Sequence, residues 1–179
     1  MVKKKKIYVI LIIIFLFSSM FLISYLFEQE IQKENENLAH NRFLEKISVV
    51  VNDISYDKIK ENSAFDIYEC LKNDSVVAFI ALYSGKGLTD DYLIAISFAI
   101  NEDNELLIHN YKFIEYGAKD KKYVLMIDEN IELKEKIINK NINESLETEI
   151  VSGATITSNE LYKALNDAIV KIKGYKENE

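Results

Sequence analysis

Four apolar runs in the middle of the chain are separated by short polar stretches. These runs predict strands at residues 66–71, 76–83, 92–100 and 106–114. The connections hold turn residues, such as Asn73-Asp74 and Ser84-Gly85-Lys86-Gly87. Because the connections are short, consecutive strands are expected to pair as an antiparallel meander. Residues 123–127 are a candidate extra strand, and residues 131–138 are a candidate helix.

Helical spacing marks both ends of this β-rich region. One C-terminal stripe comprises Leu161, Ala164, Leu165, Ala168, Ile169 and Ile172. Gly174 follows where a C′ residue is expected. Residues 43–54 carry a second apolar helical face, and residues 28–41 are mostly polar. We interpret residues 28–55 as a helical stalk, with a disordered linker as the alternative. The predicted fold class is α+β, an antiparallel sheet flanked by helices.

The N-terminal segment has the pattern of a membrane anchor. Lys3 to Lys6 precede an uncharged apolar run over residues 7–27, which as a helix spans roughly 30 Å, the thickness of a bilayer core. A cleaved signal peptide is the rival interpretation, but the run ends without a small-x-small site. The lysines predict a cytoplasmic N-terminus. The expected organisation is residues 1–27 as lysines and one transmembrane helix, 28–55 as stalk, and 56–179 as an extracytoplasmic domain.

Charge and composition exclude several classes of function. The formal net charge is −7, and every acidic residue follows Phe27. Nucleic acid is therefore not an expected partner, because phosphate binding needs a basic face. Cys70 is the only cysteine, so no intrachain disulfide and no cysteine metal site are possible. His40 and His109 fall in different predicted elements, and no catalytic or metal-binding set is indicated.

A segment ahead of the last helix contains candidate chemistry. Thr157 and Glu160 have the capping-box spacing, which predicts Thr157 as the N-cap of that helix. Gly153 and Ala154 leave the preceding backbone uncrowded. Thr155 then places a hydroxyl just outside a helix N-terminus, where free N–H groups and the helix dipole favour a phosphate. Taken alone, the local pattern favours a capped helix that follows a loop of small residues and has no bound phosphate.

The whole segment, Ser152-Gly153-Ala154-Thr155-Ile156-Thr157-Ser158, resembles the flavinylation motif of the FMN-binding domain family. That family includes the G subunit of Rnf complexes and the C subunit of sodium-pumping NADH:quinone oxidoreductase. Its members have one N-terminal span and an extracytoplasmic domain. The resemblance implies that a flavin transferase uses FAD to attach FMN to Thr155 through a phosphoester, and that the rest of the motif binds FMN.

Two departures mark a divergent member of this family. Glu149 stands where the motif usually has Asp, and is the expected carboxylate for recognition by the transferase. The Pro-Gly-Leu-Gly loop of the two named subunits is missing, since the chain contains no proline; residues 115–118 stand near its expected place.

The resemblance implies a membrane-anchored electron-transfer flavoprotein with covalent FMN. It would act as an electron carrier, or as a subunit of an oxidoreductase complex, in an Rnf-like or other extracytoplasmic respiratory system with redox protein partners. Tyrosines that are candidates to stack on the flavin include Tyr83, Tyr92, Tyr116 and Tyr123, and for each of them the favoured interpretation is a half-buried strand tyrosine. Two alternatives stay open: a flavin that reduces a soluble acceptor directly, and an anchored binding or interaction module without flavin.

Overall fold

The computed structural model describes the backbone of residues 2–178 and the side chains of residues 18–178. The chain divides into two units, Met1–Phe43 and Leu44–Glu179. Helix α1 (Val2–Ser48) forms the first unit and continues into the second, where the short helix η1 (Val49–Val51) follows it. The stretch predicted as a stalk is therefore helical over residues 28–48.

Most of the predicted membrane span, residues 7–17, lies outside the residues whose side chains the structure describes. Within the part that is described, no helix combines the length and the apolar character that crossing a bilayer requires. Over residues 28–43 the side chains of α1 are exposed, apart from a partly buried Phe43.

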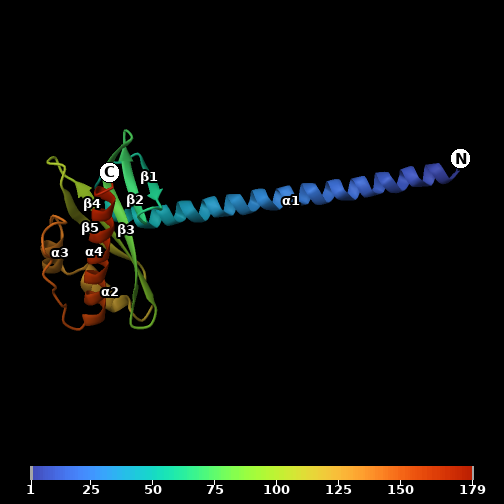
Figure 1. Ribbon diagram of the computed structural model, residues 1–179. Helices are drawn as coiled ribbons and strands as arrows, with labels where there is room; N and C mark the ends of the chain where they lie inside the picture. The colour runs from blue at the N-terminus through green and yellow to red at the C-terminus, as the bar shows by residue number, and fades with distance from the viewer. Residues whose placement is uncertain (1, 179) are drawn as a thin grey trace. The chain divides into compact units, whose positions relative to one another are not determined.

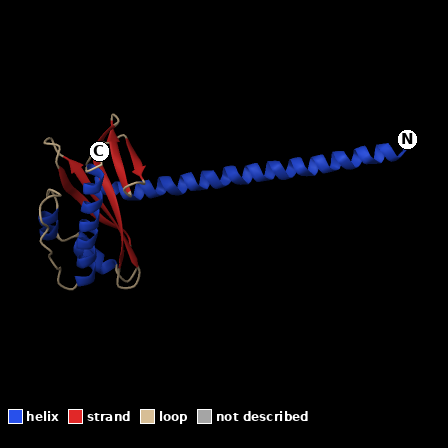
Figure 2. Cartoon of the chain, viewed as in Figure 1, coloured by secondary structure: helices blue, strands red, loops and turns tan. Residues whose placement is uncertain are grey.

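The second unit is built on one five-stranded antiparallel sheet (Figures 1 and 2). Its strands are β1 (Lys58–Asn62), β2 (Ile67–Lys72), β3 (Ser75–Lys86), β4 (Asp91–Ile100) and β5 (Leu106–Glu115). They pair in sequence order, β1-β2-β3-β4-β5. The four predicted strands, the antiparallel meander and the α+β class are thus confirmed. Strand β1 was not predicted.

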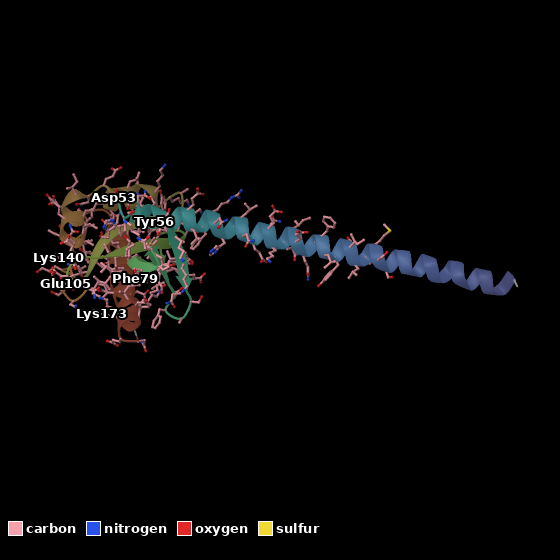
Figure 3. All side chains as sticks on the ribbon, turned by 90° about the horizontal axis from the view of Figure 1, so that it is seen from above. Asp53, Tyr56, Phe79, Glu105, Lys140 and Lys173 are labelled. Carbon is pink, nitrogen blue, oxygen red and sulfur yellow. The ribbon has the colours of Figure 1, made fainter. Side chains whose placement is uncertain are left out.

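The C-terminal helix α4 (Thr155–Lys176) covers one face of this sheet (Figure 1). All six residues of the predicted apolar stripe are buried there. Phe79 of β3, labelled in Figure 3, meets Tyr175 of α4 edge to face, with 5.0 Å between ring centroids. Gly174 lies inside α4, so its prediction as the C′ residue was wrong.

The opposite face of the sheet carries a smaller buried set. Its members are Ile47, Val50 and Val51 before the sheet, and Cys70, Ala78, Ile80 and Ala95 on the strands. The Ser97 hydroxyl donates to the Val50 carbonyl at 2.6 Å, which fixes η1 to β4. Both faces of the sheet therefore carry buried side chains.

Two short helices connect β5 to the motif segment: α2 (Lys121–Asp128) and α3 (Ile131–Ile137). The helix predicted near residue 131 is confirmed. The strand predicted at residues 123–127 was wrong, because this stretch lies in α2. Val124 and Ile127, three residues apart on one helical face, are fully buried, while Leu125 and Met126 between them are exposed.

Candidate functional site

A pocket of about 220 Å³ lies at the N-terminal end of α4. Figure 1 shows this end beside α2 and the connection between β3 and β4. The pocket is lined by Leu88, Tyr123, Gly153, Ala154, Thr155, Ile156 and Thr157. Sites that enclose a drug-sized ligand measure roughly 300–1,000 Å³, so this one would cover part of such a ligand and leave the rest in solvent.

The loop that leads into α4 is held by its own hydrogen bonds. Gly153 has φ +83°, a left-handed conformation that glycine adopts without strain. The Ala154 N–H donates to the Val151 carbonyl at 2.9 Å. The Ser158 hydroxyl accepts from the Val151 N–H at 3.1 Å and donates to the Ala154 carbonyl at 2.9 Å. This buried hydroxyl therefore links the two ends of the loop, Val151 and Ala154.

Helix α4 begins at Thr155 with Ala154 as its N-cap, three residues earlier than the capping box predicts. Thr157 is in the first turn, and among the described residues no side chain caps this helix end, so the predicted N-cap was wrong. The capping box does not form because the Glu160 carboxylate binds groups of β3 instead of the backbone N–H of Thr157. This carboxylate accepts from the Lys86 N–H at 3.1 Å and from the Tyr83 hydroxyl at 3.3 Å, and so ties α4 to the end of β3.

The two motif threonines face different surroundings. Thr155 is exposed at the edge of the pocket, whereas Thr157 is 2 % exposed. The Thr157 Oγ1 atom lies 3.1 Å from the hydroxyl oxygen of Tyr92, which is itself 1 % exposed. Burial raises the pKa of Tyr92 above its ordinary value, so this phenol stays protonated. Of these two threonines, only Thr155 offers its hydroxyl to a reagent from solvent.

The remaining motif residues divide between surface and interior. Ser152 and Gly153 are exposed, and Ala154 and Ser158 are buried. The Glu149 carboxylate lies 2.6 Å from the Lys136 ammonium of α3, and this ion pair raises the pKa of Lys136. The chain around Glu149 is irregular.

Sequence reasoning missed Asp120, a fully buried residue that holds two walls of the pocket. Its carboxylate accepts from the Leu88 N–H at 3.1 Å and from the Thr89 N–H at 3.3 Å. Its backbone carbonyl accepts from the Tyr123 N–H at 2.9 Å. Leu88 and Tyr123 are far apart in sequence, and no local pattern signals that one aspartate joins them.

Of the four tyrosines considered as flavin contacts, Tyr123 lines the pocket. The Lys122 ammonium lies 4.6 Å from the centroid of the Tyr123 ring, a cation–π contact. The Tyr92 hydroxyl contacts Thr157, the Tyr83 hydroxyl donates to Glu160, and Tyr116 packs against the core. Among the described residues, no three His, Cys, Asp or Glu side chains are arranged to hold a metal ion.

The fold and the pocket together define a small α+β ligand-binding domain. Residues 88–170 match the family model described as "FMN-binding domain". The match begins at Leu88 and includes α2, the motif loop and most of α4, so every residue that lines the pocket falls inside it. Residues 88–170 therefore belong to the FMN-binding domain family, which supports FMN as the cofactor. No curated protein and no solved structure matches the chain.

Proposed function

We propose that this protein is a membrane-anchored electron carrier whose FMN is bound covalently to Thr155. The observation that carries the proposal is the position of the Thr155 hydroxyl: exposed, at the first position of α4, on the edge of an apolar pocket. The neighbouring hydroxyls of Thr157 and Ser158 are buried and hydrogen-bonded to protein atoms.

The residues present fit both parts of FMN. The first N–H groups of a helix lack intrahelical partners and carry its positive dipole end, so the start of α4 suits a phosphate ester. Leu88, Tyr123 and Ile156 offer apolar and aromatic surface to one part of the flavin ring. Gly153 leaves the loop beside Thr155 open, with the nearest atom to an added Cβ being Met126 Cε at 3.4 Å.

Attachment by a flavin transferase is chemically balanced with FAD as the donor. A bond forms between Thr155 Oγ1 and the phosphorus of the FMN half of FAD. The phosphoanhydride bond breaks, AMP leaves, and the threonine hydroxyl loses its proton. We propose that the transferase recognises the segment through Glu149, which lies on the surface beside Lys136. Bound FMN supplies one- or two-electron transfer.

The proposed setting is the outer side of a cell membrane. The support is the order of Lys3 to Lys6 and the apolar run at residues 7–27, which is the pattern of a single span with a cytoplasmic N-terminus. Electrons would pass between the flavin and protein partners of an Rnf-like or other extracytoplasmic respiratory system. The open pocket would leave part of the ring accessible to such partners.

Expression of the full chain with a flavin transferase tests the cofactor. We expect a yellow protein that gives a fluorescent band on a denaturing gel, because a phosphoester survives unfolding. Yellow protein that loses its colour on denaturation would contradict the covalent bond. Colourless protein with transferase and FAD present would favour the flavin-free binding module.

Protease digestion of spheroplasts tests the orientation. We expect added protease to degrade residues 28–179 while the cells stay intact. Degradation only after lysis would contradict the proposed side of the membrane. A cytoplasmic protein that stays intact until lysis is the control.

A further inference from the structure

The first turn of α4 is fixed to the sheet by one buried pair of hydroxyls, Tyr92 and Thr157. Their oxygens are 3.1 Å apart, and both side chains are at most 2 % exposed. Asp120 is their neighbour: a Cβ built on Gly87 would lie 2.7 Å from Tyr92 Cε1 and 2.8 Å from Asp120 Oδ2. The negative charge of Asp120 also contributes to the raised pKa of Tyr92, after burial.

Packing alone does not require these hydroxyls. A phenylalanine and a valine would fill nearly the same volume, and replacing both partners of a buried hydrogen bond with apolar groups of the same shape is often nearly neutral. A hydrogen bond differs from apolar packing in being directional. Together with the bonds of Glu160 to β3, the pair therefore helps to fix the rotation of the helix start about its own axis.

That rotation decides where Thr155 points. An α-helix has 3.6 residues per turn, so two residues that are two positions apart are separated by about 200° around the axis. With Thr157 held inward by Tyr92, Thr155 is turned outward to solvent, as its exposure shows. Asp120 also accepts hydrogen bonds from the backbone N–H groups of Leu88 and Tyr123, two residues that line the pocket beside Thr155.

We propose that Tyr92 and Thr157 are positioning residues for flavin attachment. Their hydrogen bond fixes the first turn of α4 so that Thr155 Oγ1 meets the FMN phosphorus of FAD in the transferase complex. This role rests on the proposed function, since it concerns the same threonine. Loss of the bond lowers the rate of attachment without removing the hydroxyl that reacts.

The test is the rate of covalent flavin incorporation into the purified full chain, followed by intact mass with FAD and flavin transferase. We expect Tyr92→Phe and Thr157→Val each to slow attachment about two- to tenfold at saturating FAD, the effect of losing one buried hydrogen bond. The KM for FAD should stay unchanged, since the transferase supplies FAD and the lost bond lies within the acceptor chain. Thr157→Ser keeps the hydroxyl and should restore most of the rate.

Two comparisons separate positioning from general destabilisation. Tyr111→Phe is the matched control, because Tyr111 is equally buried and its hydroxyl bonds to the Ile127 carbonyl of α2. It should attach flavin at the wild-type rate. The double variant Tyr92→Phe/Thr157→Val should be no slower than either single variant, because both act through one bond.

Each result has one meaning. Wild-type protein without covalent flavin would overturn the proposed function itself. Wild-type attachment with unchanged rates in Tyr92→Phe and Thr157→Val would overturn only the positioning role. Equal slowing in Tyr111→Phe would do the same. If Thr157→Val does not fold, Tyr92→Phe and Thr157→Ser still decide the question.

Discussion

The two ends of α4 each border a pocket, and they are built differently. The pocket at the C-terminal end is the larger, about 300 Å³ against about 220 Å³. It is lined by Asn104, Glu105, Leu106, Asn141, Ile142, Asn143, Lys173, Lys176 and Glu177. In Figure 3 the labelled side chains of Glu105 and Lys173 belong to this end.

What differs is the interior behind each pocket. At the N-terminal end, Asp120, Tyr92 and Thr157 are buried and hydrogen-bonded, so the walls are fixed. At the C-terminal end, the bond from the Lys176 ammonium to the Asn104 carbonyl lies on the surface. Such exposed polar contacts contribute little stability. A candidate site is thus better recognised by the buried groups that support it than by its volume.

The largest expected change in stability comes from adding a side chain to the packed interior behind the pocket at the N-terminal end of α4. In Gly87→Ala the added Cβ would lie 2.4 Å from the Asp90 carbonyl oxygen, besides its contacts with Tyr92 and Asp120. Backbone and buried side chains would have to shift. We expect a loss of about 1–3 kcal/mol in the free energy of unfolding. Urea denaturation followed by circular dichroism measures it; an unchanged midpoint would mean that this interior is looser than described.

A smaller loss is expected from Gly153→Ala. Here space is available, but φ is +83°, where an L-residue is strained. The expected cost is about 1–2 kcal/mol. The same urea titration detects it. Wild-type stability in this variant would contradict the left-handed conformation of the motif loop.

The smallest change, of opposite sign, is expected at the other end of the helix. Gly174 lies inside α4, and an added Cβ would meet no atom within 4 Å. Gly174→Ala should therefore stabilise the protein by about 0.5–1 kcal/mol through helix propensity. It should leave flavin attachment unchanged. Destabilisation would show that α4 ends before this residue.

The sheet was largely predictable because its strands are apolar and separated by turn residues. Strand β1 escaped because it is an edge strand with a single apolar residue, Ile59. The strand predicted at residues 123–127 was wrong because a short apolar run does not distinguish strand from helix. The helix is set by the Asp120 carbonyl, which accepts from the N–H groups of Tyr123 and Val124.

The candidate site was predictable only in part. The local pattern predicted Thr155 beside the start of the last helix and the resemblance marked the segment as a motif, but the N-cap was predicted at Thr157. Glu160 matched the capping box in spacing, yet the Lys86 N–H and the Tyr83 hydroxyl bind its carboxylate. Leu88 and Asp120 reach the pocket through tertiary packing, which local spacing does not encode.

The most direct test of the account is the position of the flavin. Trypsin cleavage after Lys140 and Lys163 would release one peptide, residues 141–163, that contains the whole motif. Fragment masses of this peptide from flavin-loaded full-length protein should place the added FMN, less one water, on Thr155. The variant Thr155→Val, grown with the same transferase, should yield only the unmodified peptide. FMN on Ser152, Thr157 or Ser158, or an unmodified wild-type peptide from fully loaded protein, would contradict the assignment of Thr155 as the attachment site.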